Sequence, residues 1–227
     1  TSTHEQMKLA GELAAQYPDT YIQTHVAENT DEVKWVKELY PDARSYLDVY
    51  DGYGLMRQRA LYAHCIWLDD QDRARMAATQ SAATLCPTSN LFLGSGLFDL
   101  NKLEAHGVRV GLGTDVGAGT SFSQLQSLNE AYKVMQLQGK KLDPFKSLYL
   151  ATLGGANALY LDDRLGNFLP GKDADFLVLD YNATPLISYR MQQARSLEER
   201  LFALTMLGDD RAVKETFAAG VSVHQRS

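Results

Sequence analysis

The segment VRVGLGTDVGAGTSFS, residues 108–123, joins a short apolar run to a glycine-rich loop that contains one carboxylate, Asp115. Glycine loops of this kind bind phosphate in two well-known motifs, and neither motif fits. After Gly113 the next glycine of a dinucleotide fingerprint comes one residue late, at Gly117, and no lysine is present for a Walker loop. The segment therefore predicts a strand with a carboxylate at its carboxyl end. Taken alone, Asp115 is interpreted more simply as an Asx turn that ends the strand.

Strand and helix patterns alternate on the amino-terminal side of this segment. Short apolar runs predict strands that end near His25, at His64 and at Pro87. Between and around them, apolar residues at helical spacing predict helices. The order strand–helix–strand is typical of parallel βα units in an α/β fold. The predicted helices cover residues 3–17, 29–42, 69–82 and 99–107, and further helices follow from residue 122 to about residue 161.

The sequence changes character after Asp162. Residues 166–180 are rich in turn formers and include a strand pattern at residues 175–179. A helix is predicted at residues 196–207, and a β-hairpin at residues 213–225. We therefore expect two domains, a catalytic one at residues 1–161 and a small β-containing one at residues 162–227.

Three of the predicted strands end on a side chain that can bind a metal or move a proton. These are His25 (followed by Glu28), His64 and Asp115. In α/β folds functional residues gather at the carboxyl ends of strands. Each histidine also has a structural interpretation, because a histidine near a strand end can be satisfied by a backbone carbonyl or by another core partner. Three such residues on consecutive units favour a functional site.

Composition excludes several classes of partner. The chain has 28 acidic residues against 22 lysines and arginines, a net charge of −6, and no basic patch, which argues against nucleic acid and anionic membranes as partners. Two cysteines cannot form a disulfide framework, and they indicate a reducing, cytoplasmic environment. Without a CxxC pair, Cys65 and Cys86 are expected to be buried thiols rather than zinc ligands.

A set of stretches resembles, in order, the later half of the amidohydrolase superfamily. They are HVAENTDEV, LYAHC, CPTSN, GLGTD, ATLGGANAL and LGNFLPGKDADFLVLD, and together they span essentially the whole chain. Within the superfamily, SNLFLGSGLF and above all GTDVGAGTSFS resemble the guanine deaminase family. Triazine hydrolases and S-adenosylhomocysteine-type deaminases share HxAE and GTD but usually differ after Asp115.

The resemblance implies an α/β fold that is the C-terminal half of a metal-dependent-hydrolase TIM barrel, with part of a small β-sandwich domain and one zinc ion. It implies His25 and Asp115 as zinc ligands, Glu28 as the proton shuttle and His64 as the group that orients the attacking water. Glu28, His64 and Asp115 are then catalytic, and His25, Glu28 and Asp115 contact the substrate. The implied reaction is the hydrolysis of guanine to xanthine and ammonia. In it, Glu28 protonates the purine ring and Asp115 carries a proton to the leaving amine.

The sequence departs from the family pattern at one point. No H-x-H motif occurs in the chain, although in the family that motif supplies two further zinc ligands. Catalytic zinc sites usually have three protein ligands and a water. We therefore expect the chain alone to bind zinc weakly and to turn over little or no guanine. A half barrel also leaves strand edges and apolar surface uncovered, which predicts a homodimer or other self-association, or pairing with a missing half.

Two alternatives remain open from the sequence. One is another aminohydrolase or chlorohydrolase of the same superfamily, which a panel of substrates would separate from a guanine deaminase. The other is a non-catalytic remnant that acts as a binding module. Retention of His25, Glu28, His64 and Asp115 argues against the remnant, whereas the absent H-x-H keeps it open.

Overall fold

The computed structural model describes residues 2–226. Thr1 and Ser227, the outermost residues of the two predicted domains, lie outside the described residues. The first helix, α1 (His4–Gln16), begins at Thr3 with a capping box, in which Thr3 and Gln6 each bind the other's backbone N–H. This confirms the start of the helix predicted over residues 3–17.

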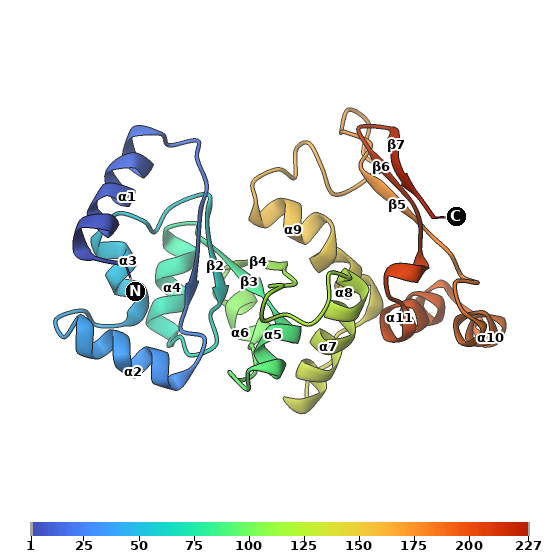
Figure 1. Ribbon diagram of the computed structural model, residues 1–227, viewed down its shortest axis with the longest axis horizontal. Coiled ribbons are helices and arrows are strands. Elements are labelled where there is room, and N and C mark those ends of the chain that lie inside the picture. The colour runs from blue at the N-terminus through green and yellow to red at the C-terminus, as the bar shows by residue number, and fades with distance from the viewer. Residues whose placement is uncertain (1, 227) are drawn as a thin grey trace.

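Four parallel strands form the main sheet, in the order β1-β2-β3-β4 (Figure 1). They are β1 (Ile22–Val26), β2 (Ala60–His64), β3 (Ala82–Leu85) and β4 (Arg109–Leu112). Val26 pairs with His64, and Leu85 pairs with Leu112, so the carboxyl ends of neighbouring strands lie level with one another. Consecutive parallel strands joined by helices are expected of βα units, and a fragment of a TIM barrel fits this order.

Helices join the strands and cover the sheet, and large apolar side chains such as Tyr62, Met76, Leu85 and Phe98 fill the core with less than 2% exposure. After β4 the chain is helical, as predicted, although one expected helix is broken in two at Thr152. The helices of this part are α2 (Thr30–Leu39), α3 (Tyr46–Gly52), α4 (Asp70–Ala78), α5 (Pro87–Phe92), α6 (Leu100–Ala105), α7 (Gln124–Leu137), α8 (Pro144–Ala151) and α9 (Leu153–Ala158).

The strand predicted to end at Pro87 is present but ends two residues earlier. The strand β3 stops at Leu85, and Pro87 begins α5 instead of merely closing the strand. The physical reason is that proline has no N–H and a fixed φ, which suits the first turn of a helix. Helix α3 and a later helix, α10 (Pro185–Gln193), were not predicted.

The C-terminal residues form a second sheet of three antiparallel strands, in the order β5-β6-β7. These are β5 (Phe176–Leu179), β6 (Val213–Ala218) and β7 (Val221–Gln225), and the last two form the predicted hairpin. A β-sandwich requires a second facing sheet, and residues 2–226 contain none in this region, so that part of the prediction is not confirmed.

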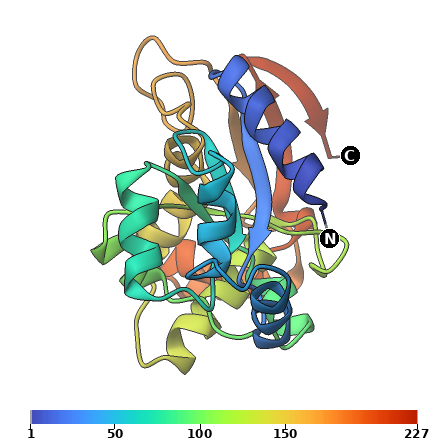
Figure 2. The ribbon, with the colours of Figure 1, turned by 90° about the vertical axis from the view of Figure 1, so that its left-hand side faces the viewer.

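Helix α11 (Leu197–Leu207) connects the C-terminal region to the first part of the molecule. It packs against α7, where the Asn129 side chain donates to the Met206 carbonyl at 2.6 Å and the Tyr132 and Phe202 rings meet edge to face. Figure 1 shows the small sheet with α10 and α11 at the opposite end of the molecule from α1, and Figure 2 shows α1 beside the edge strand β1. None of the described helices has the length and apolar character needed to cross a bilayer.

Candidate active site

The candidate site lies at the carboxyl ends of the parallel strands. His25 is the second-last residue of β1, and Glu28 follows that strand after a turn at Ala27. His64 is the last residue of β2, and Asp115 lies in the loop after β4. Because the strands are parallel and in register, these four predicted residues come from the same edge of the sheet.

Left-handed backbone is concentrated at this edge. Ala27, His64, Cys65 and Asp115 have φ values of 48°, 72°, 50° and 51°. Residues other than glycine adopt this conformation only at a cost of roughly 1–3 kcal/mol each, and such residues cluster at functional sites. Here the turns redirect the chain as each strand ends.

The side chains of His25, His64 and Asp115 converge. Each offers one possible ligand atom, and these atoms all lie within 4.8 Å of one another. His64 Nε2 is 3.8 Å from Asp115 Oδ2 and 3.7 Å from Glu28 Oε2, and the two imidazole rings stack with centroids 5.3 Å apart. The His64 side chain is 1% exposed, that of Glu28 16% and that of Asp115 25%, whereas His25 lies open to solvent.

This donor set fits a metal cation. Nε2 of His64 is buried and makes no hydrogen bond within the described part of the chain, although two carboxylates lie near it. Two imidazoles and a carboxylate are ligands that zinc accepts. Sequence analysis assigned the metal to His25 and Asp115 only, and the geometry adds His64 as a third side chain able to hold it. His64 is predicted to orient the attacking water, and both that role and a role as a metal ligand would use Nε2.

Hydrogen bonds fix both the side chain and the backbone of Glu28. Its Oε1 accepts a hydrogen bond from the Ser95 hydroxyl at 2.9 Å, and its backbone N–H donates to Glu32 Oε2 at 2.9 Å. The other oxygen of Glu32 accepts from the Tyr46 hydroxyl at 2.9 Å. Burial, with smaller contributions from Tyr50 and Glu32, raises the pKa of Tyr46, so its hydroxyl stays protonated and keeps donating.

The two cysteines are free and buried, as predicted. Burial raises the pKa of Cys86 to about 12, and the nearby Asp115 adds to the effect. The pKa of Cys65 is also raised, mainly by burial. Neutral thiols are poor metal ligands and poor nucleophiles.

Gly119 closes the loop that carries Asp115. Its N–H donates to the Asp115 carbonyl, and Val116 forms an isolated bridge with it. A Cβ at Gly119 would lie 1.7 Å from the Thr114 carbonyl oxygen, so the turn admits only glycine.

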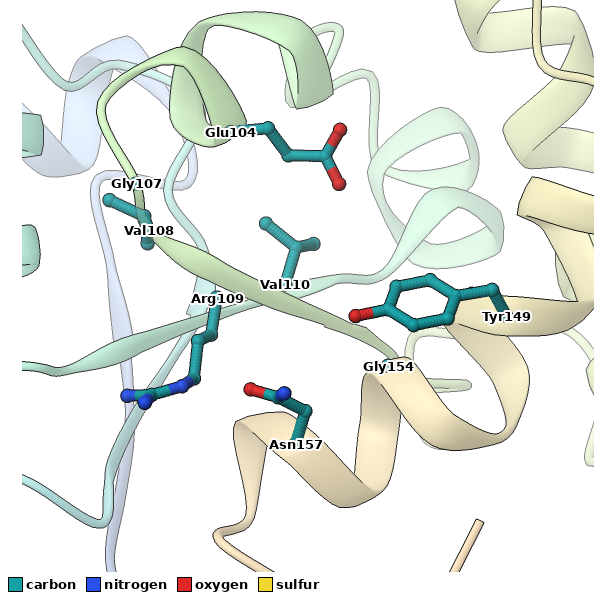
Figure 3. A pocket seen from close by; sticks show the side chains of 8 residues that line it. All are labelled: Glu104, Gly107, Val108, Arg109, Val110, Tyr149, Gly154 and Asn157. Carbon is teal, nitrogen blue, oxygen red and sulfur yellow. The ribbon is translucent and has the colours of Figure 1, made fainter. Parts of the chain in front are cut away.

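Another cavity, of about 220 Å³, lies at the start of β4 (Figure 3). Glu104, Arg109, Tyr149 and Asn157 are among the residues that line it. The Arg109 guanidinium stacks on Tyr160 at 4.3 Å, and Glu104 pairs with Lys146. This cavity is at the amino end of the strand, whereas the candidate site is at the carboxyl ends.

The other three histidines lie away from this site. His106 caps α6 and its ring contacts the Lys102 carbonyl, and His224 lies in the exposed strand β7. His4, which begins α1, contacts the Tyr53 hydroxyl.

Three residues that support the site were not predicted from the sequence. Asn90, Ser95 and Glu32 each bind a site residue through a side chain. Only Glu32 carried a local signal, because an acid three residues after the N-cap Asn29 is the spacing of a capping box. The contacts of Asn90 and Ser95 span 26 and 67 residues, and no local pattern reports them.

Comparisons with known proteins agree on one family. The family model described as "Amidohydrolase family" matches residues 1–223. The chain is 52% identical to the guanine deaminase of Escherichia coli (strain K12), a match covering 100% of this chain and 52% of that protein. The chain therefore spans about half the length of the curated relatives it matches.

Solved structures give the same result. A structure of E. coli guanine deaminase superposes with a TM-score of 0.98, covering 100% of this chain and 53% of that one. A guanine deaminase from C. acetobutylicum with guanine in its active site matches at 30% identity and a TM-score of 0.89, covering 99% and 53%. A zinc-bound adenosine deaminase from Xanthomonas campestris matches at 26% identity and a TM-score of 0.84, covering 98% and 48%.

Proposed function

The chain belongs to the amidohydrolase family, and on that basis we propose that its site takes part in the zinc-dependent hydrolysis of guanine to xanthine and ammonia. The observation that carries the proposal is the convergence of His25, His64 and Asp115, next to Glu28, in a chain 52% identical over its full length to a guanine deaminase. Guanine is the proposed substrate because two of the relatives are guanine deaminases, one of them solved with guanine bound.

His25, Asp115 and His64 are the side chains that would hold the zinc ion. A zinc ion supplies Lewis-acid chemistry that makes water a nucleophile near neutral pH. His25 and Asp115 are the ligands predicted from the sequence, and the buried Nε2 of His64 can either complete the set or orient the attacking water.

Glu28 is the proposed proton shuttle. Its Oε1 is fixed by the Ser95 hydroxyl, which leaves Oε2, 3.7 Å from His64 Nε2, to take a proton from the attacking water. Glu28 then delivers that proton to a purine ring nitrogen, which makes C2 electrophilic. One water oxygen replaces the amino group at C2.

Asp115 carries the second proton. Its Oδ2 is 3.8 Å from His64 Nε2 and its side chain is one-quarter exposed, so the carboxylate is open enough to protonate the leaving amine of a bound purine. The amine leaves as ammonia and the product is xanthine. His25, which is open to solvent beside His64, is proposed to contact the purine as well.

The proposed activity is that of a protein as long as the relatives, of which this chain matches about half. We expect this chain alone to bind zinc weakly and to release little ammonia, because it offers fewer ligands than such a site when the H-x-H pair is present.

The test is a hybrid in which this chain replaces the matching part of E. coli guanine deaminase. We expect the hybrid to release ammonia from guanine, and Glu28→Gln to lower kcat by about a hundredfold or more. Glu38→Gln, an exposed site on α2, is the matched control and should leave kcat unchanged. A Glu28→Gln hybrid as active as the control would overturn the proposed role of Glu28.

A substrate panel separates the alternatives. Guanine, adenosine, cytosine and a chlorotriazine are offered to the same hybrid, and the proposal expects guanine to give the highest kcat/KM. Preference for adenosine or a triazine would assign the site to another branch of the family. No turnover of any substrate would favour a binding module.

A further inference from the structure

The segment after β3 lacks a residue that binds metal or moves a proton in the proposed mechanism. Cys86 follows β3, and its thiol stays neutral because burial raises its pKa. The short helix α5 begins next. Two polar side chains of this segment contact residues of the site. They are Asn90, 1% exposed, and Ser95, 3% exposed.

The Asn90 side chain fixes the orientation of His64. Asn90 Oδ1 lies 2.8 Å from His64 Nδ1, and both groups are buried. The structure turns the carboxamide oxygen of Asn90 toward Nδ1, and an acceptor in this place favours the tautomer that carries the imidazole proton on Nδ1. Nε2 is then left with its lone pair, and it is this atom that faces Glu28 and Asp115.

Ser95 fixes the orientation of Glu28. Its hydroxyl donates to Glu28 Oε1 at 2.9 Å, and its carbonyl accepts from the Trp67 indole N–H at 3.0 Å. The backbone N–H of Trp67 donates in turn to the carbonyl of Ala27, the residue before Glu28. A closed ring of contacts therefore joins Ser95 to both the side chain and the backbone of this turn.

One helix ending couples the two contacts. Gly94, with φ of 67°, ends α5 in a Schellman motif, in which the N–H of Ser95 donates to the Asn90 carbonyl at 2.9 Å and the N–H of Gly94 donates to Leu91. The motif thus fixes where Ser95 lies in space relative to Asn90, five residues earlier in the chain. A change in this turn moves both contacts together.

We propose that α5 and its Schellman turn form a positioning element, in which Asn90 sets the tautomer of His64 and Ser95 holds the carboxylate of Glu28. The part concerning proton transfer rests on the proposed function, whereas the two contacts do not. Neither residue touches the reacting atoms, so both are positioning residues.

The tautomer of His64 tests the first contact. Long-range proton–nitrogen NMR spectra of the 15N-histidine-labelled chain are recorded without metal, and they show which ring nitrogen of each histidine carries the proton. His64→Gln identifies the signal among the five histidines. We expect wild-type His64 to carry its proton on Nδ1, Asn90→Asp to keep it there, and Asn90→Leu to lose this preference.

A wild-type His64 protonated on Nε2 would overturn the assignment to Asn90, as would an Asn90→Leu spectrum identical to wild type. If Asn90→Leu does not fold, the wild-type and Asn90→Asp spectra decide the point by themselves.

The carboxyl carbon of Glu28 tests the second contact. In the chain labelled with 13C-glutamate, Glu28→Gln identifies the resonance, which we expect to move in Ser95→Ala and to return in Ser95→Thr. Ser89→Ala is the matched control. Ser89 is buried in α5, the helix before Ser95, and its hydroxyl has no partner in residues 2–226. An unmoved resonance in Ser95→Ala would overturn the assignment.

Turnover connects the element to catalysis. In the hybrid with E. coli guanine deaminase, Ser95→Ala should lower kcat about tenfold or more with KM little changed, as expected for one lost hydrogen bond to a charged group. Ser95→Thr should restore kcat, and Ser89→Ala should not alter it. A hybrid without any guanine turnover would defeat the proposed function, and the NMR results would still decide the two contacts.

Discussion

At the scale of single residues, the site depends on backbone that is held in an unfavourable conformation. His64 and Asp115 have φ values of 72° and 51°, and Ala27 has 48°. The surrounding sheet must supply the energy that keeps these turns formed. A glycine near these turns is required where a side chain would clash with the backbone, and Gly119 is such a position.

Replacing Gly119 by alanine should displace Asp115. The new Cβ would lie 1.7 Å from the Thr114 carbonyl oxygen, so the turn must open. We expect the free energy of unfolding in urea to fall by roughly 1–3 kcal/mol. Gly52→Ala, where a Cβ meets nothing within 4 Å, is the control and should change it by less than about 1 kcal/mol. Equal effects of the two substitutions would contradict the assigned role of Gly119.

The buried thiols predict a pH dependence of reactivity. Burial raises the pKa of Cys86 to about 12 and also raises that of Cys65, above the ordinary value near ~8.5. At pH 8 both thiols should resist Ellman's reagent in the folded chain and react fully in urea. Rapid reaction of the folded chain would show that the thiols are accessible.

The raised thiol pKa values also determine how stability depends on pH. The folded chain holds the thiol protons more tightly than the unfolded chain. The neutral thiols therefore contribute fully to the free energy of unfolding below the thiol pKa of the unfolded chain. This contribution is lost progressively as pH rises from that value toward the folded pKa. Alkaline solution should therefore destabilise the chain, and Cys86→Ala should reduce that dependence.

At the scale of elements, local signals located most of the fold. Short runs rich in apolar and β-branched residues located β1, β2 and β4 within a few residues, because such residues favour strands. Helix α5 was missed because Pro87 both ends a strand pattern and begins a helix. Helix α3 was missed because its seven residues are too few to show a helical period.

The candidate site divides in the same way. His25, Glu28, His64 and Asp115 could be found because each lies at the carboxyl end of a recognisable strand or just after it. Their supporting partners could not, since Asn90 and Ser95 act across the sheet on residues far away in sequence. The convergence of His64 with the predicted ligands likewise required the register of β1 and β2.

Helix α11 should be essential to the stability of the first part of the molecule. Leu204, 2% exposed, packs with Leu125 of α7 in one apolar cluster. Leu204→Ala should lower the free energy of unfolding by about 2–5 kcal/mol. Leu197→Ala, on the same helix but 56% exposed, should change it by less than about 1 kcal/mol. A small effect of Leu204→Ala would favour two regions that fold independently.

At the scale of the whole molecule, the main sheet has two open edges. Within residues 2–226, β1 pairs only with β2, and β4 pairs only with β3. The cavity in Figure 3 is lined by residues 107–110, at the start of β4. Unpaired strand edges are templates for further pairing.

Self-association of the isolated chain is therefore expected. Sedimentation velocity should show a sedimentation coefficient that rises with protein concentration. Supplying the rest of the relative's sequence in the hybrid should reduce that dependence, because the edges then find partners within one chain. A monomer at all concentrations would contradict the expectation.

The most direct test of the central claim is zinc-dependent ammonia release from guanine by the hybrid, compared with its Asp115→Asn variant. After chelation and dialysis, added zinc should restore turnover in the hybrid, and the variant should lose zinc affinity and turnover together. An Asp115→Asn variant that retains full zinc-dependent turnover would contradict the assignment of this site.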